Sequence, residues 1–246
     1  MPMQEAGEGE HRFSGPLAEE YELITLAYPD FESFQRRVVD VIAREAPGAQ
    51  HLLEIGTGNG FTTRMIMDIP AAAVISVDND PHMVAQARSH LADYESDSSD
   101  GRRLTIEKAD ALEFLRRGEA GRFDVVVSAF TLHNMERDYR EGVEGEIFRV
   151  LKPGGLFVNA DKYAPDDEAR FDALVHQVER FFDAFVPRGK LDLLRRWVVH
   201  NIADQSPRYV MRASESIRRL KTLGFDAVHI GERAHMQAIV HARKPL

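Results

Sequence analysis

A glycine-rich loop between two apolar runs constrains the fold of this chain more than any other feature. Residues 51–55 form a short apolar run, residues 56–60 contain three glycines, and residues 61–69 have helical spacing. Glycine lets a chain turn tightly between a strand and a helix and leaves bare backbone against a ligand. A second apolar run at 73–77 completes the pattern. The sequence therefore predicts a β-α-β unit with parallel strands.

The alternation of strands and helices continues along the chain. Residues 104–106, 123–127 and 156–158 are further apolar runs, and helical stretches separate them. This pattern predicts a doubly wound, Rossmann-like α/β fold whose ligands bind at the carboxyl ends of the strands. Residues 225–230 and 236–242 are β-like and adjacent. We expect them to complete a seven-stranded, mostly parallel sheet as a C-terminal antiparallel pair.

Composition excludes several classes of protein. The 246 residues include no cysteine, which rules out disulfides, thiolate zinc sites and a cysteine nucleophile, and we expect no metal. The net charge of −9 argues against bulk binding of nucleic acid. No apolar run approaches the roughly 20 residues that cross a bilayer, and the first residues lack a secretion signal. We therefore expect no membrane partner and a cytoplasmic location.

The spacing of the glycines distinguishes between two kinds of nucleotide ligand. In a dinucleotide-binding loop the third glycine would stand at position 61, where this chain has Phe61. The second predicted strand ends at Asp78, and a carboxylate at that point accepts hydrogen bonds from ribose hydroxyls. The ligand predicted from these residues has a ribose and no pyrophosphate.

Five segments, taken in order, resemble those of the class I S-adenosylmethionine-dependent methyltransferases. They are EIGTGNG at 54–60, VD at 77–78, ADA at 109–111, FDVVVS at 123–128 and LKPGG at 151–155. The first segment alone is a weak signal, whereas all five in order are a specific one. The resemblance is close over residues 50–160 and holds only in outline elsewhere. It implies a methyltransferase whose cofactor is S-adenosyl-L-methionine.

The resemblance also implies which residues bind this cofactor. The glycine loop should cradle the methionine moiety, Asp78 should hold the ribose, and Asp110 should accept from the adenine amino group. Asp78 and Asp110 are also suited to cap helices, which is the alternative role for each. Glu54 stands where many members have Asp, and Asn79 follows Asp78 where other side chains are common. The full expected set is Glu54, Gly56, Thr57, Gly58, Gly60, Asp78, Asn79, Met83, Asp110, Ala111 and Ala129.

Candidate catalytic residues follow the fourth and fifth predicted strands. A sulfonium cofactor needs a nucleophile placed in line with the C–S bond, and a base only where that nucleophile must lose a proton. His133 is the candidate base, because the ordinary pKa of imidazole lies near neutrality. Asp161 and Lys162 are the other candidates. The alternatives are a histidine that only shapes the pocket or faces solvent, and an ordinary surface ion pair at 161–162.

A looser resemblance concerns the C-terminal half. Four segments are similar to the branch that contains carboxy-S-adenosylmethionine synthases of tRNA modification: residues 159–163, the helical insert, residues 194–201 and residues 223–225. In those enzymes an arginine of the insert binds the extra carboxylate, and Arg196 is the position that aligns with it. The alternative for Arg196 is a lid residue. Tyr21 is the second candidate for substrate binding.

These observations predict one methyltransferase domain built from four parts. They are an N-terminal helical cap at 1–48, a cofactor-binding core at 49–165, a helical lid insert at 166–222 and a closing β-hairpin at 223–246. We expect methyl transfer to an oxygen, nitrogen or carbon atom of a small-molecule substrate. The alternatives are a carboxy-S-adenosylmethionine synthase-like enzyme and a non-catalytic, cofactor-binding regulatory protein. The sequence leaves a homodimer open.

Overall fold

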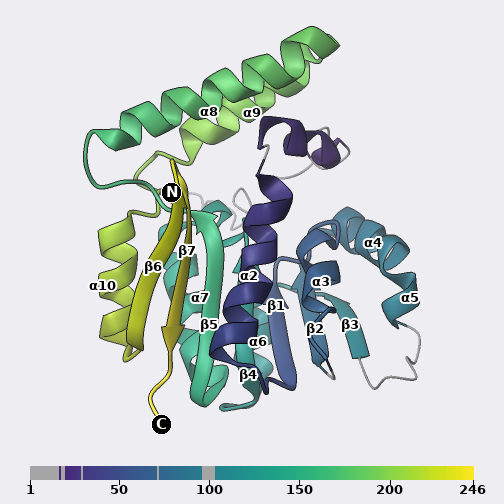
Figure 1. Ribbon diagram of the computed structural model, residues 1–246, viewed down its shortest axis with the longest axis vertical. Coiled ribbons are helices and arrows are strands. Elements are labelled where there is room, and N and C mark those ends of the chain that lie inside the picture. The colour runs from purple at the N-terminus through teal and green to yellow at the C-terminus, as the bar shows by residue number, and fades with distance from the viewer. Residues whose placement is uncertain (1–16, 18–19, 29, 71, 96–102) are drawn as a thin grey trace, which may run out of the picture.

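A computed structural model of the chain describes residues 17, 20–28, 30–70, 72–95 and 103–246 (Figure 1). Its central sheet has seven strands in the order β3-β2-β1-β4-β5-β7-β6. The first five are parallel, and β7 runs antiparallel to both β5 and β6. The strands are β1 (His51–Ile55), β2 (Ala73–Asp78), β3 (Arg103–Lys108), β4 (Phe123–Ala129), β5 (Leu151–Lys162), β6 (Asp226–Ala234) and β7 (Gln237–Arg243). The predicted seven-stranded fold with a closing antiparallel pair is confirmed.

The register of the sheet brings the carboxyl ends of the inner strands to one edge. Ile55 at the end of β1 pairs with Val77 of β2 and Ser128 of β4. The fifth strand is longer than the run 156–158 predicts, because it also includes the Lys-Pro-Gly-Gly turn. The register of β5 against β4 shifts there, between Phe123 and Val125.

Side chains that alternate along the strands build a core on each face of the sheet. Leu52 of β1 lies in the core under α2 (Phe31–Glu45), whereas Leu53 lies in the opposite core with α7 (Arg137–Val150). The first core also contains residues of α3 and α4, and the second contains residues of α6 and α10. The bounds of these helices are α3 (Phe61–Ile66), α4 (Pro81–His90), α6 (Ala111–Arg117) and α10 (Ala213–Leu223), and a short α5 (Ala92–Glu95) follows α4.

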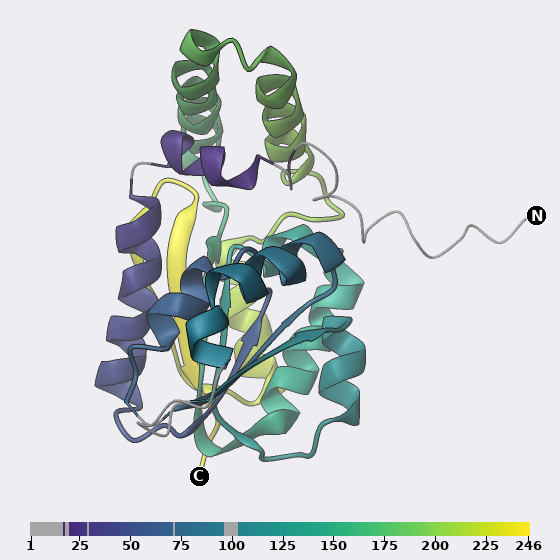
Figure 2. The same ribbon diagram turned by 90° about the vertical axis from the view of Figure 1, so that its right-hand side faces the viewer.

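Two helices stand side by side above the carboxyl ends of the parallel strands (Figures 1 and 2). They are α8 (Ala169–Phe185) and α9 (Leu191–Ala203), joined by a 3-10 turn, η3 (Val186–Arg188). A 3-10 segment, η1 (Tyr21–Ala27), packs against them through a shared apolar cluster that includes Ile24, Phe181 and Trp197. Helices α8 and α9, which we call the lid from here on, and η1 therefore lie over the edge where ligands are expected.

Two details differ from the simplest interpretation of the sequence. The helical spacing from 17 to 45 is divided between η1 and α2, because Tyr28 leaves the helical region with φ −129° and ψ 80°. The predicted insert at 166–222 includes α10, which lies against α7 and β6 rather than with α8 and α9. Within the described part of the chain, no helix combines the length and the apolar content that a bilayer crossing requires.

Candidate active site

The glycine loop is fixed to the neighbouring strand by its own backbone. The amides of Gly56 and Thr57 both donate to the carbonyl of Val77, at 2.8 and 3.1 Å. Gly56 has φ +86°, and a Cβ at this position would collide with the side chain of Thr131, in the loop after β4. The close approach of these two loops therefore requires glycine at position 56.

Asp78 lies where a ribose-binding carboxylate is expected. Its Oδ2 accepts from the amide of Gly58 at 2.8 Å, and its Oδ1 accepts from the amide of Asp80 at 3.0 Å. Burial raises the pKa of Asp78, although these amide donors act in the opposite direction. The cap of α4 is Asp80, which accepts from the amides of His82 and Met83. The alternative role of Asp78 as that helix cap is therefore wrong.

Asp110 does cap a helix. Its Oδ1 accepts from the amide of Glu113 at 2.8 Å at the start of α6. Its Oδ2 accepts from the hydroxyl of Tyr139 at 2.6 Å. The predicted adenine contact stays a prediction, and both carboxylate oxygens already have partners within the protein.

Glu54 lies underneath the glycine loop. Its carboxylate is fully buried and accepts from Thr63 Oγ1 at 2.5 Å and from Ser76 Oγ at 2.6 Å. Ser76 Oγ is in turn 2.6 Å from the hydroxyl of Thr57 in the loop. Burial raises the pKa of Glu54 to about 7. These hydrogen bonds connect Glu54 through Ser76 to Thr57, and they support the glycine loop from below.

The other predicted cofactor residues lie at the same edge of the sheet. Met83 is buried in the first turn of α4, and Asn79 is exposed just after β2. Ala111 begins α6 and Ala129 ends β4, each packed against one of the two cores. The structure thus gathers residues from four segments around the carboxyl ends of β1, β2 and β4.

The three predicted catalytic residues come together after β4 and at the end of β5. His133 belongs to a 3-10 turn, η2 (Leu132–Asn134), and its Nδ1 is 2.5 Å from Asp161 Oδ1. The backbone amide of His133 also donates to Asp161 Oδ2, at 3.2 Å. Asp161 is fully buried, and His133 and Lys162 are 4% and 8% exposed. An ordinary surface ion pair at 161–162 is therefore wrong.

The partner of Lys162 is a residue that the sequence reasoning missed. Lys162 Nζ donates to Asp204 Oδ2 at 2.8 Å, just past the end of α9. Burial alone would lower the pKa of Lys162, but the charges of Asp204 and Asp161 and the hydroxyl of Tyr28 together raise it. For Tyr28, burial raises the pKa of the hydroxyl, whereas the hydrogen bond between this hydroxyl and Lys162 lowers it.

His200 is the second missed residue. His200 Nε2 lies 3.7 Å from Asp204 Oδ1, and His133 Nε2 lies 4.0 Å from Asp204 Oδ2. One signal was available in the sequence. After Trp197, polar residues recur at the spacing of one helical face and are buried: His200, Asn201 and Asp204.

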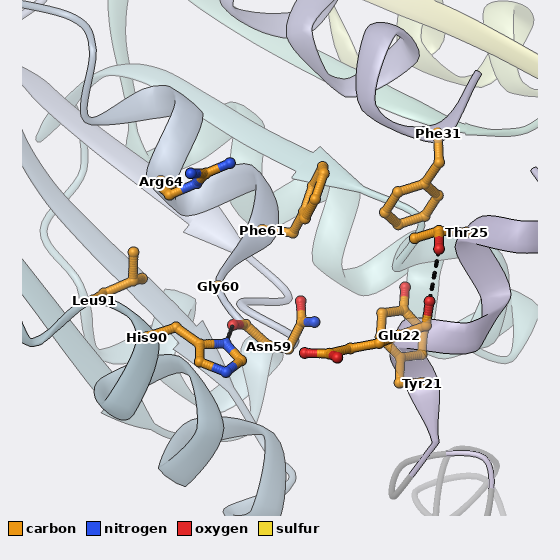
Figure 3. A pocket seen from close by; sticks show the side chains of 10 residues that line it. All are labelled: Tyr21, Glu22, Thr25, Phe31, Asn59, Gly60, Phe61, Arg64, His90 and Leu91. Carbon is orange, nitrogen blue, oxygen red and sulfur yellow. Dashed lines mark hydrogen bonds between the residues drawn. The ribbon is translucent and has the colours of Figure 1, made fainter. Parts of the chain in front are cut away.

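The two predicted substrate residues lie in different surroundings. Tyr21 lines a pocket of about 460 Å³ between η1 and the start of α3, together with Phe31, Phe61 and Asn59 of the glycine loop (Figure 3). Arg196 is on the exposed side of α9, where its Nε donates to Asp192 at 2.8 Å. The structure does not bring Arg196 together with His133, Asp161 and Lys162.

Comparisons with known proteins identify similar sequences. Residues 52–155 match a family model described as a methyltransferase domain. A demethylmenaquinone methyltransferase of Thermus thermophilus is 30% identical over 231 residues, which is 88% of this chain and 98% of that protein. A carboxy-S-adenosyl-L-methionine synthase of Photobacterium profundum is 26% identical over 68% of this chain and 67% of its own length.

Solved structures share the fold. Phosphoethanolamine N-methyltransferase 2 of Haemonchus contortus, in complex with S-adenosyl-L-methionine, superimposes with a TM-score of 0.62 at 13% sequence identity. The match covers 98% of this chain and 61% of that one. At this identity the likeness concerns the fold alone.

Proposed function

The chain belongs to the class I S-adenosylmethionine-dependent methyltransferases, and from this premise we propose that it methylates a small molecule with the help of a His133–Asp161 pair. Its cofactor is S-adenosyl-L-methionine. The observation that carries the proposal is the 2.5 Å contact between His133 Nδ1 and Asp161 Oδ1 at the end of β5. A buried pair of this kind has a use when the acceptor atom must lose a proton.

The residues at the sheet edge fit the cofactor. The loop at Gly56 has no room for a side chain, and Asp78 presents a partly buried carboxylate that caps no helix. Gly56, Gly58 and Gly60 would hold the methionine moiety, and Asp78 would hold the ribose. The bound cofactor supplies an electrophilic methyl carbon on a positively charged sulfur. The protein then has to position the acceptor and exclude water.

His133 is oriented for proton transfer. When Nδ1–H donates to the carboxylate of Asp161, the lone pair of the neutral ring is on Nε2. Nε2 takes the proton of the acceptor, and the negative charge of Asp161 stabilises the imidazolium that results. Lys162 and Asp204 join β5 to the lid by a buried ion pair beside this histidine.

The acceptor that we propose is an aromatic or quinone-type molecule. The Thermus relative is a demethylmenaquinone methyltransferase by name, and this chain is similar to it over nearly the full length of both. The pocket beside the glycine loop is lined by the rings of Tyr21, Phe31 and Phe61. Aromatic walls favour a flat acceptor, and the charged side chains of Glu22 and Arg64 line the same pocket.

Carboxy-S-adenosylmethionine synthesis is the second candidate. The similarity to the Photobacterium enzyme favours it. The ion pair of Arg196 with Asp192 on the exposed side of α9 does not. The mass of the ligand that copurifies with the protein separates the two, because only the second reaction yields a cofactor with an added carboxylate.

The experiment that tests the proposal has two parts. Calorimetry with S-adenosyl-L-methionine should show one site per chain, and Asp78→Ala should weaken binding at least about tenfold, because the loss of a charged hydrogen-bond partner is worth roughly 1.5–3 kcal/mol. Transfer of labelled methyl groups should then be measured with demethylated quinols, phenols and amines. Binding without transfer to any acceptor would favour a regulatory protein, and no binding by the wild type would refute the assignment.

A further inference from the structure

A compact cluster of three buried side chains lies where the end of α9 meets η2: His133, His200 and Asp204. The three side chains are 4%, 6% and 4% exposed, and they come from η2 and from the C-terminal end of α9. One ligating atom from each lies within 4.8 Å of the other two. Two imidazoles and a carboxylate in this arrangement are unexpected in a site that needs only one base. The absence of cysteine excludes thiolate metal sites but leaves nitrogen and oxygen ligands available.

The distances within the cluster are close to those of a metal site. Asp204 lies between the two rings, with Oδ1 3.7 Å from His200 Nε2 and Oδ2 4.0 Å from His133 Nε2. Tetrahedral ligation with bonds of about 2.0–2.1 Å places neighbouring ligand atoms roughly 3.3 Å apart. The three ligand atoms lie within 4.8 Å of one another, so they have to approach by up to about 1.5 Å when an ion binds.

The residues behind the cluster are suited to hold it. Asp161 accepts from Nδ1 of His133, which fixes the tautomer and leaves Nε2 for a ligand. A carboxylate behind a metal-ligating histidine is the usual second partner in such sites. The ring planes of His133 and His200 are nearly perpendicular, at 88°, so the two rings are not stacked against each other.

Lys162 does not block the site. Its ammonium binds Oδ2 of Asp204, whereas Oδ1 is the oxygen closer to His200. A carboxylate can therefore bind a cation through Oδ1 and retain Lys162 on Oδ2.

We propose that His133 Nε2, His200 Nε2 and Asp204 Oδ1 bind one divalent transition-metal ion of the zinc type. Two imidazoles and one carboxylate are a ligand set for Zn²⁺ and Co²⁺ rather than for Mg²⁺ or Ca²⁺. The inference goes beyond the proposed methyl transfer and does not depend on it. Because Nε2 of His133 cannot hold an ion and accept a proton together, the bound ion converts the site to a form without a free base. Zn²⁺ is therefore an inhibitor of any reaction that needs this base.

The test uses the full-length protein, dialysed against a chelator and free of added cofactor. Titration with Co²⁺ should give the visible absorption of a four-coordinate ion at one equivalent per chain, and Zn²⁺ should displace it. His200→Ala and Asp204→Ala should each weaken Co²⁺ binding at least about 100-fold. Asp161→Asn, behind the ligand His133, should weaken it about 10- to 100-fold.

A matched control distinguishes the site from adventitious binding by histidines. His176 and His235 stack with ring centroids 3.9 Å apart, away from the cluster, and His176→Ala should leave Co²⁺ affinity within twofold of the wild type. Circular dichroism checks that each variant is folded, and His200→Gln replaces His200→Ala if the latter is not. Absence of one-equivalent binding would overturn the proposal. Binding that survives both His200 and Asp204 substitutions, or that is lost in His176→Ala, would also overturn it.

Discussion

Asp161 binds His133 twice, through Oδ1 to the ring Nδ1 at 2.5 Å and through Oδ2 to the backbone amide at 3.2 Å. One carboxylate at the end of β5 thus fixes both the position of η2 and the orientation of its imidazole. The buried amide of Asn159 reaches the same carboxylate, at 3.5 Å, and donates to the hydroxyl of Tyr163 at 2.8 Å. The ring is therefore held by β5 on one side and is directed towards the lid on the other.

The first prediction concerns this pair. His133→Asn should lower kcat by about 10²- to 10⁴-fold on an acceptor that must lose a proton, because the base is lost. Asp161→Asn should have a smaller effect of about tenfold or more, because the ring stays but its orientation and its imidazolium lose support. Both should change the Kd for S-adenosyl-L-methionine by less than about threefold. Steady-state kinetics and calorimetry on the same preparations provide the measurement, and an unchanged kcat in His133→Asn would remove the base role.

The second prediction compares two glycines of one loop. A Cβ at Gly56 would collide with Thr131, whereas a Cβ at Gly58 has no other atom within 4 Å. Both glycines have positive φ, +86° at Gly56 and +53° at Gly58, so alanine strains the backbone at either position. Only at Gly56 does the added Cβ also collide with a neighbouring side chain. Gly56→Ala should therefore destabilise the protein by about 1–3 kcal/mol more than Gly58→Ala. Thermal unfolding of both variants checks this, and equal destabilisation would contradict it.

The first half of the fold could be predicted because its signals are local. The run 51–55, the glycines that follow it and Asp78 lie close together in the sequence, and each constrains the backbone or the ligand directly. The closing antiparallel pair was equally local. The cofactor edge was predicted because the carboxyl ends of parallel strands necessarily meet there.

The lid side of the site could not be predicted in the same way. Lys162 and Asp204 are 42 residues apart, and only the packing of α9 over β5 brings them into contact. A residue's helical phase also decides its role, because Arg196 faces solvent while Trp197, one position later, faces inward. The roles of η1 and of Tyr28 depend on the same lid contacts, which no short motif specifies.

The third prediction concerns the ion pair between Lys162 and Asp204. Lys162→Met leaves a buried carboxylate without its ammonium partner and should destabilise the protein by about 3–5 kcal/mol. The double variant Lys162→Met/Asp204→Leu removes both charges and should be more stable than Lys162→Met alone. Guanidinium unfolding of the wild type, both single variants and the double variant measures the coupling. Additive effects of the two substitutions would mean that the pair contributes nothing.

The last prediction concerns the buried carboxylate beneath the glycine loop. Burial raises the pKa of Glu54 from 4.5 to about 7, so the folded protein holds a proton there that the unfolded chain releases above about pH 4.5. The stability that this proton contributes is fully present below pH 4.5 and is lost as the pH rises to about 7. The loss amounts to about 3 kcal/mol at most, because one pKa unit corresponds to about 1.4 kcal/mol. Above about pH 7 the contribution is constant.

Glu54→Gln isolates this effect, because glutamine cannot ionise and its carbonyl can still accept from Thr63 and Ser76. The free energy of unfolding of the variant, relative to the wild type, should rise by up to about 3 kcal/mol between pH 4.5 and about pH 7. Urea unfolding at a series of pH values measures the difference. Parallel curves for the two proteins would show that Glu54 is ionised in the folded state throughout this range, and its polar contacts would then have to offset the burial of a full charge.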